Sequence, residues 1–172
     1  MAVKKDFLML FFIILLSAVL IMGTEFQSVE EYYLTHADEI TEDSDRVYFS
    51  INCEKALSSG KLSDAQLKEL NNGEILKQKE YVLIEDETVF DVLKRVCRFE
   101  KIHMEYQGAD KNIYNSVYVQ GLNYLYEFDC GELSGWVFLV NGKQTDLSCG
   151  KYKLKDGDKV EWVYSLEAGK DL

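Results

Sequence analysis

The chain has 172 residues, of which 47% are hydrophobic and 13% aromatic, and it contains no proline. This composition leaves room for one compact domain with a real core, and it excludes global disorder and a proline-rich stalk. The formal net charge is −11, from 30 acidic and 19 basic residues. Such an acidic chain is a poor match for nucleic acid, because that binding requires lysine and arginine to neutralise phosphates.

The N-terminus predicts export. Two lysines precede Phe7–Met22, an apolar stretch in which one serine is the sole polar residue. This order is typical of an export signal, so residues 1–23 are expected to be a signal peptide or a membrane anchor, with the rest extracytoplasmic. Both alternatives stay open. Ile21-Met22-Gly23 is a poor cleavage site, and a helix over the stretch would span about 24 Å, less than the ~30 Å of a hydrocarbon core.

A polar and acidic run over residues 24–46 is predicted to be a solvated tether. Nine acids and three bases lie between Met1 and Arg46, so this leading part carries a charge of −6 and the remainder −5. The folded domain is expected over residues 47–172.

The domain is expected to begin with a strand over Val47–Cys53, which is β-branched and aromatic. A polar insert follows, with a short helix near Asp64–Leu70, because Ser63 and Gln66 form a capping-box pattern. A second strand is expected over Ile75–Ile84.

The clearest predicted helix begins after Thr88, which can cap it together with Asp91. Apolar residues recur at helical spacing and form one stripe that would face a sheet. The stripe consists of Val89, Val92, Leu93, Val96 and Cys97. Basic residues are expected on the outer face, namely Lys94, Arg95, Arg98 and Lys101.

Short strands are expected in the second half of the chain. Their ranges are Ile102–Tyr106, Val117–Val119, Tyr124–Phe128, Trp136–Val140 and Val160–Leu166. Asn141-Gly142 is the strongest hairpin signal in the sequence. A single main helix after the first strand pair predicts an α+β, β-grasp-like (ubiquitin-like) fold, in which one helix packs across a mixed sheet.

Four cysteines in an exported chain predict two disulfides. Three pairings are open, and we favour Cys53–Cys97, from the first strand to the helix, and Cys130–Cys149, across the hairpin region. These bonds would contribute about 4 and about 3 kcal/mol. A zinc site is not expected, because the sequence has no closely spaced cysteine pair.

No catalytic residue is predicted. The two histidines, His36 and His103, have no evident nucleophile beside them. Glu127, Asp129 and Glu132 crowd one corner, but charged residues at a strand end are usually solvated. Phosphate-binding and dinucleotide motifs are absent from the sequence. We therefore expect a protein that is not an enzyme and has no cofactor and no metal.

Aromatic residues gather in the last third of the chain. They are Tyr114, Tyr118, Tyr124, Tyr126, Phe128, Trp136, Phe138, Tyr152, Trp162 and Tyr164. Alternation along the last strand puts Trp162 in the core. Trp136 follows the Gly-Glu-Leu-Ser-Gly loop, and a core position and a ligand platform are equally open for it.

The stretch FDCGELSGWVFLVNG…CGKYKLKDGDKVEWVY, with DETVFDVLKRVC upstream, resembles the transcobalamin-like C-terminal domain family over roughly Val47 to Leu166. The motifs that carry the resemblance are T-V-x-D-x-L, S-G-W and Y-x-L-x-x-G-D. This family is a domain of unknown function, common in exported proteins of Gram-positive bacteria. It is related to the small β-domain of the cobalamin carriers transcobalamin and intrinsic factor.

The resemblance implies an aromatic hairpin and a glycine-rich segment that lie against a flat ligand. The ligand-binding residues it implies are Ser134, Gly135, Trp136, Phe138, Ser148, Gly150 and Tyr152. The carriers hold cobalamin between this domain and a helical barrel, which we do not expect in this chain. A second protein would then complete the site.

The first functional hypothesis is an extracytoplasmic, non-catalytic module that binds a small ligand, with cobalamin or another corrinoid as the candidate, and hands it to a transport protein. The alternative is a cell-surface interaction or adhesion module without a small ligand. Exposed aromatic side chains beside Gly135 would favour the first hypothesis. A flat surface with every aromatic residue buried would favour the second.

Overall fold

A computed structural model describes residues 9–15, 17, 40–111 and 115–172. The chain divides into two compact units, Met1–Tyr32 and Tyr33–Leu172. In the first unit, residues 9–15 and 17 are helical. Within the described part of the chain, no helix combines the length and the apolar character needed to cross a membrane. Much of the predicted export segment, and the tether up to residue 39, lie outside the described residues.

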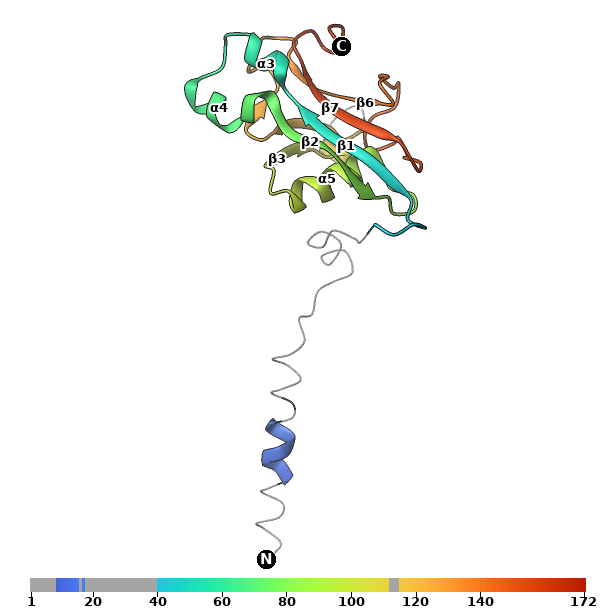
Figure 1. Cartoon of the computed structure of the whole chain (residues 1–172). Coiled ribbons are helices and arrows are strands. Elements are labelled where there is room, and N and C mark those ends of the chain that lie inside the picture. The colour runs from blue at the N-terminus through green and yellow to red at the C-terminus, as the bar shows by residue number, and fades with distance from the viewer. Residues whose placement is uncertain (1–8, 16, 18–39, 112–114) are drawn as a thin grey trace, which may run out of the picture. The chain divides into compact units, whose positions relative to one another are not determined.

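The domain is built on a four-stranded mixed sheet (Figure 1). Its strands, in spatial order, are β2 (Glu74–Val82), β1 (Arg46–Asn52), β7 (Lys159–Ser165) and β6 (Gly135–Val140). The two central strands, β1 and β7, are parallel, and each outer strand is antiparallel to its neighbour. The first and last strands of the domain therefore meet in the middle of the sheet.

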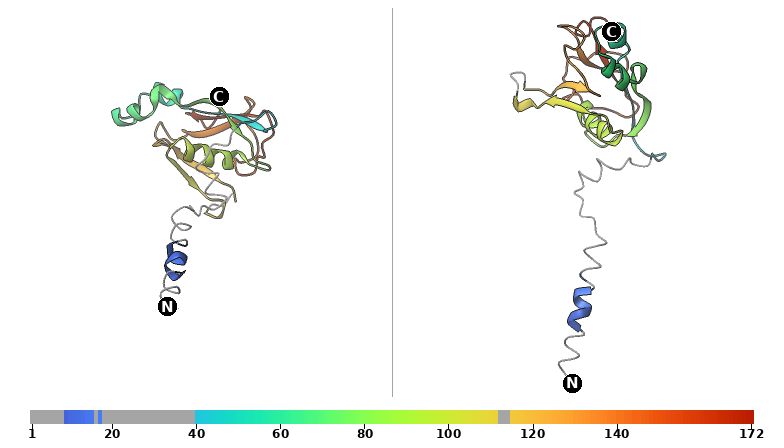
Figure 2. Two further views of the ribbon diagram at one scale, coloured as in Figure 1. Left: turned by 60° about the horizontal axis from the view of Figure 1, so that its bottom comes forward. Right: turned by 90° about the vertical axis from the view of Figure 1, so that its left-hand side faces the viewer.

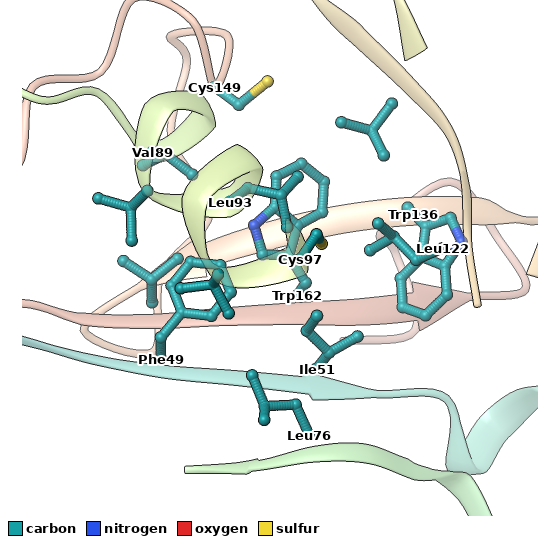
Figure 3. Packing of buried hydrophobic residues seen from close by; sticks show 14 of the residues in the cluster. Phe49, Ile51, Leu76, Val89, Leu93, Cys97, Leu122, Trp136, Cys149 and Trp162 are labelled. Carbon is teal, nitrogen blue, oxygen red and sulfur yellow. The ribbon is translucent and has the colours of Figure 1, made fainter. Parts of the chain in front are cut away.

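One face of this sheet is covered by α5 (Val89–Phe99), as Figure 2 shows. The predicted cap is present, because the Thr88 hydroxyl accepts a hydrogen bond from the Asp91 N–H while the Asp91 carboxylate accepts one from the Thr88 N–H. The predicted apolar stripe is buried along its whole length. In Figure 3 its residues gather with Phe49, Ile51 and Trp162 of the sheet. The mixed sheet with one main helix is thus confirmed.

One residue of α5 departs from the prediction. Arg95 was expected on the outer face, but it is only 6% exposed. Its guanidinium donates two hydrogen bonds to the Glu87 carboxylate, at 3.0 and 2.8 Å, and one to the Val82 carbonyl oxygen. A paired and hydrogen-bonded arginine can be buried at this position, where an unpaired one could not.

Shorter elements complete the domain. After β1 come α3 (Glu54–Ser58), α4 (Asp64–Glu69) and the 3-10 turn η1 (Asn71–Gly73). A second sheet consists of β3 (Met104–Gln107), β4 (Tyr118–Leu122) and β5 (Leu125–Tyr126), with the 3-10 turn η2 (Ala109–Lys111) between β3 and β4. The capping box at Ser63 is confirmed, whereas α3 was not predicted.

The Asn141-Gly142 turn is present but does not form the expected hairpin. Both residues have positive φ, and Val140 and Lys143 exchange backbone hydrogen bonds across the turn. The chain forms only a single bridge there, and the partner of β6 is β7, which begins at Lys159. The Asn141 side chain makes this link, since its Oδ1 accepts a hydrogen bond from the Lys159 N–H.

Neither predicted disulfide is present, because all four cysteines are free and buried. The Cys130 thiol lies against α3, 3.3 Å from the Ser59 hydroxyl, whereas the Cys149 thiol donates to the Val117 carbonyl oxygen. The two sulfur atoms thus contact different elements, although they bracket one region of the sequence.

The other favoured pair, Cys53–Cys97, is likewise unbonded. Cys53 is the N-cap residue of α3, and Cys97 faces the core from α5 (Figure 3). Burial raises the pKa of each of these two thiols to about 12. Both are therefore protonated at neutral pH.

Candidate ligand pocket

A cavity of about 260 Å³ opens where the loop before β6 meets the start of that strand. Its lining residues are Tyr118, Phe128, Glu132, Leu133, Ser134, Gly135, Trp136, Val137 and Ala168. Three of the residues implied by the resemblance, Ser134, Gly135 and Trp136, are among them.

Large apolar side chains stand exposed around this cavity. Phe128 is 60% exposed, Leu133 59% and Tyr118 44%. Exposed apolar groups that gather at a concave site are typical of a binding surface. Exposed aromatic residues beside Gly135 favour the small-ligand hypothesis over the interaction or adhesion module.

The loop that carries Phe128 is tightly folded. The Phe128 N–H donates to the Ser134 carbonyl oxygen at 2.9 Å, and the Gly131 N–H donates to the Phe128 carbonyl oxygen at 3.1 Å. Phe128 itself has a φ of 69°, which is rare for a bulky residue. Surrounding structure must hold such a backbone in place, and residues of this kind cluster at functional sites.

Ser134 fixes this loop from within. It is only 3% exposed, and its hydroxyl donates to the Gly131 carbonyl oxygen at 2.8 Å while accepting from the Cys130 N–H at 3.1 Å. The Tyr164 hydroxyl lies 3.0 Å from it and donates to the Tyr126 carbonyl oxygen. Burial raises the pKa of Tyr164 to about 12, so this phenol is protonated at neutral pH. The structure therefore gives Ser134 a supporting role in the cavity wall.

Trp136 lines the cavity but belongs largely to the core. It is 7% exposed, and its indole N–H donates to the Leu125 carbonyl oxygen at 2.9 Å. Its ring meets that of Tyr164 edge to face, with centroids 5.3 Å apart. Of the two roles left open for Trp136, burial supports the core position.

Gly135 lines the cavity without a side chain. A Cβ atom at this position would lie 3.7 Å from the Glu127 Cβ and 4.0 Å from the Tyr118 hydroxyl oxygen, which are ordinary contacts. The Tyr118 hydroxyl donates to the Glu127 carboxylate at 2.5 Å. Burial, and then this bond, raise the pKa of Tyr118. The Tyr118 hydroxyl and the Glu127 side chain that accepts from it therefore lie beside Gly135.

The other four implied ligand residues do not line the cavity. Phe138 is half-buried, with its ring centroid 5.5 Å from that of Trp162. Ser148, Gly150 and Tyr152 lie at the start of α5, where the Phe90 and Val89 N–H groups donate to the carbonyl oxygens of Cys149 and Tyr152. The structure thus separates these residues from the first three. The ligand role of all seven stays a prediction.

Comparison with known proteins gives a match to one family model over part of the chain and a shared fold. Residues 86–165 match the family model described as "Domain of unknown function (DUF4430)". Among curated proteins, none matches the sequence. The chain is similar to haptocorrin in a crystal structure of its complex with Cbi, with a TM-score of 0.51 and 11% sequence identity. A "putative metal binding protein" from Ruminococcus gnavus gives a TM-score of 0.44 at 11% identity, covering 70% of this chain and 96% of that one.

The likeness to haptocorrin covers 76% of this chain but only 27% of that one, so this chain spans about a quarter of haptocorrin's length. At this identity it shows a shared fold. Among the described residues, no three His, Cys, Asp or Glu side chains gather in a way that could hold a metal ion. Residues 86–165 match the model of a domain of unknown function, and the fold shared with haptocorrin agrees with the predicted resemblance to a transcobalamin-like domain.

Proposed function

We propose that the chain is an extracytoplasmic, non-catalytic module of β-grasp type that binds a small ligand in the cavity beside Gly135, with a corrinoid as the first candidate. The observation that carries the proposal is the exposure of Phe128, Leu133 and Tyr118 around a single concave site. Covering these side chains would remove apolar surface from water, which is worth about 25 cal/mol per Å².

The size of the cavity limits how a ligand would sit. At about 260 Å³ it is slightly smaller than the ~300–1,000 Å³ typical of enclosed ligand sites. A flat molecule larger than the cavity would rest one edge in it and stack on Phe128, leaving its other face outside. A surface or transport protein would then cover that face and receive the ligand.

Haptocorrin, which shares the fold, has been solved in complex with Cbi, and this supports a small molecule as the partner. The apolar N-terminal stretch and its flanking charges support export, with this stretch either cleaved or retained in the membrane. The four-stranded mixed sheet, with parallel central strands and α5 across one face, supports the β-grasp classification.

The test is a titration of the purified chain with cobalamin and a panel of corrinoids, followed by calorimetry and by tryptophan fluorescence corrected for absorbance. Trp136 is one of the two tryptophans and lines the cavity, so the fluorescence should change on binding. Phe128→Ala should weaken binding at least tenfold, because it removes the most exposed apolar side chain of the cavity lining. Phe99→Ala is the matched control, since Phe99 is 40% exposed on α5 and lies outside the cavity lining.

Saturable binding that is lost in Phe128→Ala and retained in Phe99→Ala supports the proposal. A flat titration up to about millimolar ligand, near −4 kcal/mol, contradicts it and favours the interaction or adhesion module instead.

A further inference from the structure

The hydrogen-bonding groups, charges and aromatic rings around the cavity indicate which class of ligand it can bind. We propose that it selects an organic cation, a substituted ammonium group attached to an apolar or aromatic body. This inference rests on the proposed function, because it concerns the same cavity. It ranks a ligand that carries an ammonium group above the corrinoid named first there, because it takes the charge of the cavity into account as well as its apolar surface.

The first observation is that the side-chain donors of the lining are already used. The Tyr118 hydroxyl donates to Glu127, the Ser134 hydroxyl to the Gly131 carbonyl oxygen, and the Trp136 indole N–H to the Leu125 carbonyl oxygen. No other side chain of the lining carries a neutral donor group. An anion would therefore have to break a protein hydrogen bond to gain a side-chain donor here.

The second observation is the sign of the charge. Glu132 is the sole charged side chain among the lining residues of the described cavity, and no lysine or arginine lines it. Glu127 adds a second carboxylate next to the lining, where it accepts hydrogen bonds from the Tyr118 hydroxyl and from the Gln120 amide. Lys61 contacts the same loop, but it donates to the Cys130 carbonyl oxygen and is not part of the lining. The local field thus favours a cation and disfavours an anion.

The third observation concerns the two exposed rings. Tyr118 and Phe128 line the cavity and remain 44% and 60% exposed. The face of an aromatic ring attracts a cation, and at exposed sites this attraction is worth a factor of about two to five in affinity. Rings and carboxylates on one cavity are the combination that recognises an ammonium group attached to an apolar body.

The test compares three probes that share one ring and differ in charge. The full chain is titrated with benzyltrimethylammonium, benzyl alcohol and benzenesulfonate, with binding followed by calorimetry and by tryptophan fluorescence. We expect the cation to bind about tenfold more tightly than the alcohol, and the sulfonate to bind most weakly. Raising the salt concentration from about 0.05 to 0.5 M should narrow these differences, because the carboxylates are partly exposed to solvent.

Two variants locate the charge effect. Glu132→Gln should lower the affinity for benzyltrimethylammonium about three- to tenfold and bring it close to that for benzyl alcohol. Glu85→Gln removes an exposed carboxylate outside the lining and should leave the order of the three probes unchanged.

Equal affinities for the three probes, or no binding by any of them, overturn the inference about charge. The proposed function is judged separately, by the corrinoid titration and its Phe128→Ala variant. Corrinoid binding that Phe128→Ala removes and Glu132→Gln leaves unchanged would keep the cavity as the site and reject the cation preference. If the chain binds neither the corrinoids nor the three probes, the cavity itself is rejected as a binding site.

Discussion

Replacing Trp136 by alanine should destabilise the domain rather than act on the ligand alone. The side chain is 7% exposed and meets the Tyr164 ring edge to face. Removing a buried tryptophan costs about 3–5 kcal/mol. The change also leaves the buried Leu125 carbonyl oxygen without its indole partner. We therefore expect Trp136→Ala to lower the free energy of unfolding by about 4 kcal/mol, much of the 5–15 kcal/mol typical of a domain.

Urea unfolding followed by far-UV circular dichroism measures this loss directly. Trp136→Phe is the matched variant, because it keeps a ring against Tyr164 and loses the hydrogen bond and part of the volume. It should cost about 2 kcal/mol. A loss below about 1 kcal/mol in Trp136→Ala would refute the assignment of Trp136 to the core and would return it to the role of a ligand platform.

Three further predictions follow from individual contacts. Gly135→Ala should keep the stability within about 1 kcal/mol, since the added methyl group meets only ordinary contacts. It should weaken ligand binding by adding a methyl group to the cavity lining, and unchanged affinity in calorimetry would contradict this. Although burial opposes it, hydrogen bonds from Ser165 and Leu166 and the 3.2 Å ion pair with Lys55 lower the pKa of Asp171. A lowered carboxyl pKa stabilises the fold above the unfolded pKa of about 3.9 and is lost as pH falls through the folded value. The urea midpoint should therefore fall between pH 5 and pH 2 more in the parent chain than in Asp171→Asn, and parallel curves would argue against this contribution. In the chain purified without reductant, all four cysteines should react with a thiol reagent in urea and react slowly without it, because they are free and buried. A titre below four would reveal a disulfide.

Elements set by local sequence were predictable. The capping boxes at Ser63 and Thr88 and the apolar stripe of α5 act within a few residues, and each is present in the structure. The strands were placed within a few residues of their observed ends for the same reason, since alternation and β-branched residues are local signals. These signals were enough to predict a mixed α+β fold with one main helix.

Features that depend on distant partners were not predictable. Arg95 reads as a surface residue until Glu87 and the Val82 carbonyl oxygen are known to enclose it. The cysteine pairs were chosen by their positions in the sequence, but Cys130 lies against Ser59 of the loop after α3. Nothing in the sequence reports these approaches across the fold.

The cavity contains residues that the sequence predicts for the site and residues that it does not. The S-G-W motif predicts Gly135 and Trp136 for the site, whereas the sequence marks Tyr118 and Phe128 only as aromatic residues. Their meeting depends on a loop that holds Phe128 at a positive φ, which no residue type in the loop demanded. One feature of the sequence does indicate this position in the site. Phe128 is a large apolar residue between Glu127 and Asp129, just before the Cys-Gly pair.

The measurement that tests the central claim most directly is a map of amide chemical shifts in the labelled chain as a bound corrinoid is added. Binding in the cavity predicts that the largest changes fall at Phe128, Leu133 and Gly135, with smaller ones at Tyr118. Changes confined to Ser148–Tyr152, which lie beside the first residues of α5, would contradict the cavity as the binding site. They would support Ser148, Gly150 and Tyr152 as the ligand-binding residues instead.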